Sequence, residues 1–152
     1  RRVERMLNPD LSGGLPAFLA VRPGVESGFM IAQVTAVDLL AELRLLAGPA
    51  SIDSVTTSAN QEDHVSMGLA AARKVYRSVQ CLERVLAIEL MCAAEAIEYR
   101  RPLRAGMGVE EAWSLVRSRV PRLEGDRMLG SDLDALTDLV ASGVLSNVVA
   151  RY

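Results

Sequence analysis

The residues best suited to chemistry lie in one polar segment, residues 51–64, which precedes a long apolar run. It ends in Gln61, Glu62, Asp63 and His64, so that an amide, two carboxylates and the only histidine of the chain are consecutive. In the first turn of a helix, free backbone N–H groups and the helix dipole stabilise a carboxylate as its anion. Acidic residues are common in first turns, so that position alone favours a structural role for Glu62.

Capping residues indicate where the helix after this segment begins. Ser58 and Gln61 have the spacing of a capping box, although Asn60 could cap the helix instead. From there to Arg101 the chain has no proline and only one glycine, and Pro102 ends the run. The pattern predicts one helix of about forty residues, roughly 60 Å long. Its second half is apolar nearly all round, which requires partners on every side in a helix bundle or an oligomer core.

The remaining sequence predicts further helices and no strands. Proline and glycine interrupt residues 7–27 too often for a regular element, so that an ordered loop is expected there. A helical pattern follows from about Ser27 to Ala47, with Gly48-Pro49 as its stop. Two shorter helices are expected at roughly 109–119 and 131–141, with Gly143 as a possible stop. The predicted fold class is all-α.

Composition narrows the function classes. Half of the residues are apolar but only 4% are aromatic, which favours packed helices over sheets. The formal net charge of −2 argues against nucleic acid or an anionic membrane as the main partner. Cys81 and Cys92 are roughly 16 Å apart on one helix, too far for a disulfide bond. We therefore expect a cytoplasmic protein with reduced cysteines, no membrane span and no metal site.

The run from Asp53 to Gly68, Asp-Ser-Val-Thr-Thr-Ser-Ala-Asn-Gln-Glu-Asp-His-Val-Ser-Met-Gly, closely resembles the motif that marks histidine ammonia-lyases among the aromatic amino acid ammonia-lyases. Three other blocks resemble the family in the same order and with similar spacing. They are residues 8–19, 27–33 and the pair 85–90 and 101–103. The resemblance covers about residues 3 to 103, whereas the tail beyond 104 matches only weakly.

The resemblance implies the C-terminal part of an enzyme with the long-helix bundle of the fumarase and aspartase superfamily. Residues 1–104 would belong to the lyase core and residues 105–152 would form a helical tail. It also implies a homotetramer and a methylideneimidazolone cofactor, formed by cyclisation of an Ala-Ser-Gly tripeptide. Ala141-Ser142-Gly143 lacks the glycine-rich, acidic surroundings of the family's cofactor loop, so we interpret it as a helix end. The true tripeptide is expected in the missing N-terminal portion.

The resemblance also assigns the site residues. Glu62 matches the catalytic glutamate of the family, which would orient and electrostatically stabilise the substrate. Met30 matches a position that lines the substrate's side-chain pocket, and Gln61 either faces the substrate or caps the helix. His64 belongs to the motif but fits a structural hydrogen bond better than proton transfer.

The implied activity is ammonia elimination from an aromatic amino acid. Met30 together with Glu62 favours L-histidine, which would give urocanate in histidine catabolism. Phenylalanine and tyrosine lyases often have Lys and Gln at these two positions. Gly48-Pro49 and Glu42-Leu43-Arg44 depart from the usual pattern of histidine lyases. Two alternatives therefore stay open: a tyrosine or phenylalanine ammonia-lyase or aminomutase, and a non-catalytic helical chain that serves oligomerisation.

Overall fold

Helices account for the regular structure of the chain, which confirms the predicted all-α class. The computed structural model describes residues 1–152. The helices, joined by loops and three short 3₁₀ turns, are α1 (Arg2–Leu7), α2 (Met30–Leu46), α3 (Gly68–Glu98), α4 (Met107–Arg117), α5 (Gly130–Ala141) and α6 (Val144–Val149). No helix is long and apolar enough to cross a membrane.

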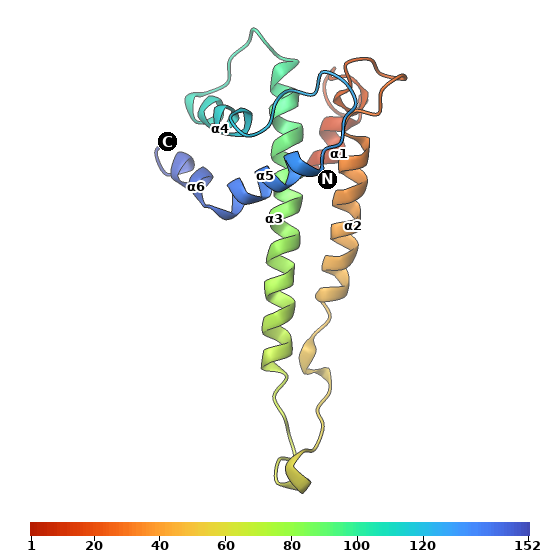
Figure 1. The fold of residues 1–152 in the computed structure, drawn as a ribbon, viewed down its shortest axis with the longest axis vertical. Coiled ribbons are helices and arrows are strands. Elements are labelled where there is room, and N and C mark those ends of the chain that lie inside the picture. The colour runs from red at the N-terminus through yellow and green to blue at the C-terminus, as the bar shows by residue number, and fades with distance from the viewer.

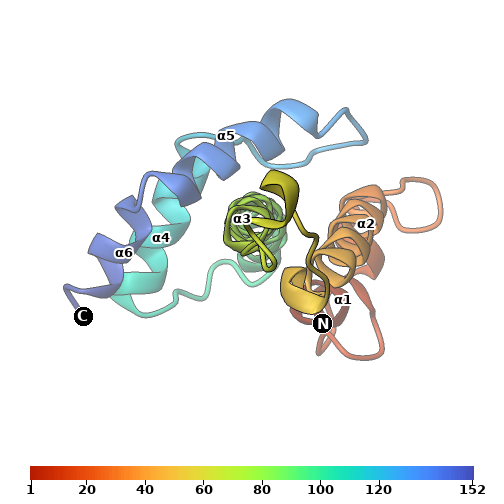
Figure 2. The same cartoon turned by 90° about the horizontal axis from the view of Figure 1, so that it is seen from below.

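Helix α3 is the central element, and the other helices pack on two of its sides (Figures 1 and 2). Helices α1 and α2 lie on one side, with α2 running antiparallel to α3, while α4, α5 and α6 form an arc on the other. The buried face of α3 includes Cys81, Ile88, Met91, Cys92 and Glu95, which recur at helical spacing. The core therefore lies around the second half of α3.

Several predicted boundaries need correction. The long helix begins at Gly68 and has 31 residues, about ten fewer than expected, because residues 58–67 form a loop. Helix α2 begins at Met30 rather than at Ser27, and α4 and α5 fall within two residues of their predicted starts. Gly143 does end α5, with a left-handed φ of 72° that glycine adopts without strain.

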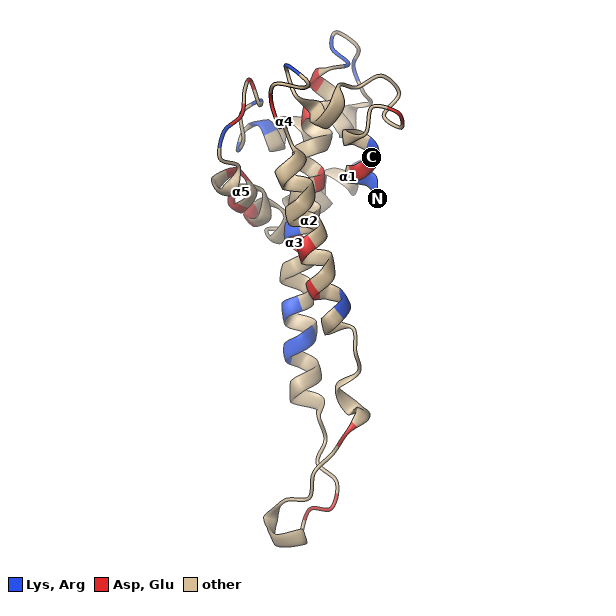
Figure 3. Ribbon diagram, turned by 90° about the vertical axis from the view of Figure 1, so that its right-hand side faces the viewer, with Lys and Arg blue, Asp and Glu red and all other residues tan.

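The helix pair formed by α2 and the first half of α3 exposes a large apolar surface. Most of this pair projects beyond the other helices, and its charged residues are few (Figure 3). Ile31, Val34 and Leu45 of α2 and Val75 and Tyr76 of α3 are more than half exposed. Patches of this size mark surfaces that other polypeptide segments cover. The exposed apolar surface of α3 thus lies on its first half, whereas its second half, where we expected the need for partners, is packed within the chain.

Both cysteines are free and buried, which confirms the expectation of reduced thiols. Burial raises the pKa of Cys92 to about 12, so that its thiol stays protonated at neutral pH. Burial also raises the pKa of Cys81. Since the thiolate is the reactive form, burial disfavours nucleophilic chemistry at both cysteines.

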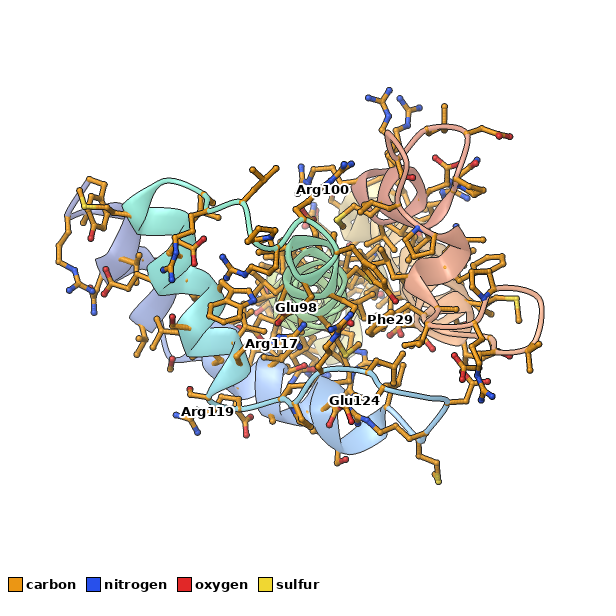
Figure 4. All side chains as sticks on the ribbon, turned by 90° about the horizontal axis from the view of Figure 1, so that it is seen from above. Phe29, Glu98, Arg100, Arg117, Arg119 and Glu124 are labelled. Atoms are coloured by element: carbon orange, nitrogen blue, oxygen red, sulfur yellow. The ribbon has the colours of Figure 1, made fainter.

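A buried carboxylate connects α3 to the tail. Glu95 is fully buried and accepts hydrogen bonds from Arg117 Nη2 at 2.8 Å, Arg122 Nε at 3.1 Å and the backbone N–H of Leu123 at 3.2 Å. Arg117 also donates to Glu98 at 2.9 Å, and Figure 4 shows these two side chains directed at each other. The cluster fixes α4 and the segment after it to the end of α3.

Replacing Glu95 should destabilise the protein far more than replacing a half-buried glutamate of the same helix, Glu89. The variant E95Q removes the buried negative charge and turns an NH2 donor toward two guanidinium groups, and it should cost about 3–5 kcal/mol of unfolding free energy. Urea unfolding followed by circular dichroism measures this loss. E89Q is the matched control, because Glu89 pairs with the largely exposed Arg2 and such pairs contribute at most about 1 kcal/mol. Equal midpoints for the two variants would contradict the assignment.

A second ion pair anchors the start of α4. Glu110 accepts hydrogen bonds from both terminal nitrogens of Arg101, at 2.8 and 2.9 Å, and from the backbone N–H of Ala105. The Arg101 guanidinium lies 4.4 Å above the ring of Trp113, in cation–π geometry. The hydrogen bonds from Arg101, followed by that from Ala105, lower the pKa of Glu110 from 4.5 to about 2.

This lowered pKa predicts a pH-dependent contribution to stability. The contribution is complete above the ordinary value of 4.5 and is lost as the pH falls toward about 2, where Glu110 takes up a proton in the folded state. The variant E110Q should therefore be less stable than the wild type at pH 7, and the gap should narrow as the pH drops below about 4.5. Unfolding midpoints measured from pH 7 to pH 3 test this, and a gap independent of pH would refute it.

Candidate active-site loop

The loop between α2 and α3, residues 53–67, occupies the free end of the helix pair (Figure 1). It carries Asp53, Glu62 and Asp63 and neither lysine nor arginine, so that this end of the molecule is acidic (Figure 3). A cationic group of a ligand would be attracted to it. We call residues 53–67 the acidic loop.

The tip of the acidic loop is a strained turn. Ser58, Ala59 and Asn60 have φ values of 55°, 51° and 71°, in the left-handed region that residues with a side chain rarely adopt. Three consecutive residues of this kind store strain of about 1–3 kcal/mol each, and such strain is concentrated at functional sites. The turn reverses the chain immediately before Gln61 and Glu62.

Two sets of hydrogen bonds hold the turn in this conformation. Thr57 and Glu62 pair as in an antiparallel sheet, with backbone N···O distances of 2.9 and 3.3 Å. Closer to the helices, the Ser54 hydroxyl accepts from the backbone N–H of Val65 at 2.9 Å and donates to its carbonyl at 3.1 Å. Ser54 and Val65 thereby join the two ends of the acidic loop, and we call this closure the neck of the loop. The loop is therefore a preorganised element rather than a loose connection.

Glu62 lies on this loop and not in the first turn of a helix, so that the predicted stabilisation by a helix dipole is wrong. Helix α3 begins six residues later, at Gly68, and the backbone N–H of Glu62 is already bound to Thr57. The capping box is also absent, because the Ser58 hydroxyl caps nothing and its carbonyl accepts from Gln61 N–H at 3.0 Å. The Glu62 carboxylate is exposed and forms no ion pair within the chain.

The structure brings three of the singled-out residues together and leaves one apart. Gln61, Glu62 and His64 are all exposed on the acidic loop, and His64 borders a shallow hollow of about 430 Å³ at its base. We expected a structural hydrogen bond for His64, but its imidazole ring forms no hydrogen bond within the chain. Met30 is half-buried at the other end of α2, whose 17 residues span about 24 Å. Within one chain, Met30 and Glu62 therefore cannot line the same pocket.

The backbone that leads into Met30 is tightly determined. Gly28 has a φ of 52°, and a Cβ atom there would lie 2.5 Å from the carbonyl oxygen of Phe18. The N–H of Phe29 donates to that same oxygen at 2.9 Å. Asp126 accepts hydrogen bonds from the N–H groups of Ser27 and Gly28, and these two bonds lower the pKa of its carboxyl group.

The chain itself holds no segment suited to form the implied cofactor. Ala141-Ser142-Gly143 lies at the end of α5, where Ser142 N–H bonds to Asp138 and Gly143 N–H to Val140. The Ser142 hydroxyl donates to the carbonyl of Leu139 at 2.7 Å. These contacts agree with our interpretation of the tripeptide as a helix end. The tripeptide lies on the opposite side of α3 from α2 (Figure 2).

Comparison with known proteins decides the family. Residues 1–118 match the family model described as aromatic amino acid lyase. This chain belongs to the aromatic amino acid lyase family. It is 52% identical over 145 residues to a histidine ammonia-lyase of Natranaerobius thermophilus, covering 95% of the chain and 29% of that relative. It is 53% identical to the histidine ammonia-lyase of Symbiobacterium thermophilum, with 95% and 28% coverage.

Solved structures support the same family placement. The histidine ammonia-lyase of Trypanosoma cruzi matches with a TM-score of 0.95 and 49% identity, over 100% of this chain and 30% of that one. A tyrosine aminomutase from Streptomyces globisporus matches with a TM-score of 0.92 and 36% identity, over 98% of this chain and 28% of that one. The chain of this lyase-family protein thus spans less than a third of the length of these relatives.

Two residues of the site escape sequence reasoning. Ser54 lies inside the motif, yet nothing in its type or spacing indicates that it would bridge to Val65. Asp126 is nearly one hundred residues from the backbone that it holds. The left-handed turn could be anticipated only in part, because Asn60 tolerates that conformation but Ser58 and Ala59 do not favour it.

Removing the Ser54 hydroxyl should loosen the acidic loop of this lyase-family chain. S54A loses two hydrogen bonds, each contributing about 0.5–1.5 kcal/mol. Hydrogen exchange at the Thr57 and Val65 amides should therefore accelerate at least about tenfold, as local opening becomes easier. S51A is the matched control, since Ser51 is exposed and its side chain forms no hydrogen bond. Unchanged exchange in S54A would show that the neck is held by other contacts.

Proposed function

We propose that the enzyme to which this chain contributes eliminates ammonia from an aromatic amino acid, with L-histidine as the substrate and urocanate as the product. The observation that carries the proposal is the acidic loop. Its strained turn is held by the Thr57–Glu62 and Ser54–Val65 hydrogen bonds and carries Glu62, whose carboxylate forms no ion pair within the chain. A carboxylate held in this way is available to a ligand.

In this proposal Glu62 orients the substrate through its cationic amino group or the imidazole N–H. A charge-assisted hydrogen bond of this kind is short and strong where water is excluded. Gln61, the neighbour of Glu62, has an amide group that can donate and accept further hydrogen bonds to the substrate. The rigid turn matters because a small displacement of an orienting group lowers the rate steeply.

The substrate pocket is completed by segments other than this chain. Glu62 is exposed here, and Met30 lies at the opposite end of α2. If Met30 lines the side-chain pocket, it must face the acidic loop of another copy. The exposed apolar side chains of α2 and α3 supply a surface for such an arrangement. We therefore propose a homotetramer in the cytoplasm, in which neighbouring helix pairs cover these faces.

The proposed cofactor is methylideneimidazolone, the electrophile that activates the amino group as a leaving group in this family. Since Ala141-Ser142-Gly143 is a helix end, the cofactor would be formed in a part of the enzyme outside this chain.

Histidine is the substrate that the comparisons favour, because relatives about 50% identical to this chain are named histidine ammonia-lyase. A tyrosine aminomutase shares the fold at 36% identity, so that a tyrosine-directed enzyme is the second candidate. Incubating the full-length enzyme with each amino acid discriminates between them, since urocanate, coumarate and cinnamate absorb at different wavelengths. An aminomutase would instead give a β-amino acid, detected by chromatography, and absence of all these products would favour a non-catalytic role in oligomerisation.

Replacing Glu62 in the full-length enzyme should abolish most of its activity. E62Q and E62A remove the anion that holds the substrate, so we expect kcat/KM for L-histidine to fall about 10²–10³-fold, the loss typical of a charge-stabilising group. D63N is the matched control, because Asp63 is an equally exposed carboxylate on the same loop. Urocanate absorbance measures the rate, and size-exclusion chromatography verifies the assembly. Near-wild-type activity in E62Q would refute the role of Glu62.

A further inference from the structure

The segment between α4 and α5 holds the beginning of α2 through one side chain. The Asp126 carboxylate accepts the backbone N–H of Ser27 through Oδ2 at 2.8 Å and that of Gly28 through Oδ1 at 2.9 Å. Both oxygens are thus used, one on each of two consecutive peptide groups. Helix α2 has no side-chain cap of its own at Phe29, so that Asp126 provides the side-chain restraint on this turn, beside the backbone bond from Phe29 N–H to the Phe18 carbonyl at 2.9 Å.

Asp126 is itself fixed by the tail. Leu123 is bound to the buried Glu95 through its backbone N–H at 3.2 Å, which anchors the segment to α3. On the other side of Asp126, Arg127 forms an ion pair with Asp132 in the first turn of α5. The carboxylate is therefore presented from a segment held at both ends, and its position follows that of α3.

Packing alone does not fix the turn that Asp126 holds. A hollow of about 600 Å³ adjoins it, bounded by Ser27, Gly28 and Asp126 and reaching Ile88 and Met91 of α3. On this side the turn therefore faces the hollow. The opposite side is closed, because Gly28 lies against the carbonyl of Phe18 and Phe29 is buried. The two hydrogen bonds to Asp126 thus hold residues 27 and 28 on the open side, while the Phe29 N–H bond to the Phe18 carbonyl holds the turn on the closed side.

From this geometry we propose that Asp126 is a positioning residue for the substrate pocket, acting through the turn at residues 27–29 on Met30. Met30 is the first residue of α2, so the direction of its side chain depends on the backbone of that turn. The inference rests on the proposed function, in which Met30 lines the side-chain pocket. It assigns the tail beyond residue 104 a part in substrate recognition.

Steady-state kinetics of the full-length enzyme with L-histidine test the proposal. D126A removes both acceptors, and we expect its KM to rise about tenfold with kcat changed less than about threefold, because a displaced pocket wall weakens binding. D126N keeps one acceptor oxygen and should show an intermediate KM. A merely structural role would reduce the amount of folded enzyme, which lowers the apparent kcat and leaves KM unchanged.

The double variant M30A/D126A shows whether Asp126 acts through Met30. If it does, D126A should raise KM by less than about twofold once Met30 is already alanine, since coupled residues are not additive. D134A is the matched control for the tail, because Asp134 is an exposed aspartate of α5 that pairs with Arg84 at 2.8 Å. Its KM should equal that of the wild type.

The possible failures are separable. A wild-type enzyme that releases no urocanate overturns the proposed function. An active enzyme in which D126A and D126N keep the wild-type KM overturns the positioning role alone. The same conclusion follows if M30A leaves KM unchanged, or if the effects of M30A and D126A simply multiply. Should D126A fail to fold, D126N still decides between the two results.

Discussion

Glu95 takes a carboxylate out of water and surrounds it with two guanidinium groups and a peptide N–H. Removing such a group from water is unfavourable, and only a complete set of partners offsets that cost. The partners come from α4 and from residues 122 and 123, so that burial of this one side chain requires the tail to be in place. Through Leu123 the same constraint reaches Asp126, and through Asp126 the beginning of α2. The two sides of α3 are thereby coupled by polar contacts as well as by the apolar core.

The helices could be predicted where the signals are local. Periodicity and the stops at Gly48 and Gly143 locate α2 and α5 to within a few residues, because such signals act on the neighbouring backbone. The start of α3 could not be predicted. Ser58, Asn60 and Gln61 have the right types for a helix cap, but their backbone adopts a left-handed turn stabilised by the pairing of Thr57 with Glu62. Residue type does not show which of two hydrogen-bonding schemes is used.

For the site, the motif indicated the right segment but not its geometry. Gln61 and Glu62 do share one loop, as their adjacency requires. The separation of Met30 from that loop follows from the length of α2, since Met30 is its first residue and the loop follows its last, and the predicted helix already implied it. The contribution of Asp126 depends on a contact between residues nearly one hundred positions apart. Spacing in the sequence is informative about chemistry within a segment and much less about how segments meet.

The exposed apolar stretch along α2 and the first half of α3 has a kinetic consequence. In the proposed tetramer, side chains such as Leu45, 82% exposed, and Tyr76, 69% exposed, would reach their final surroundings only when another protomer docks. Between separate molecules this is a second-order process. The yield of refolding would then depend on protomer dilution, with slow docking competing against aggregation of the uncovered helix pair.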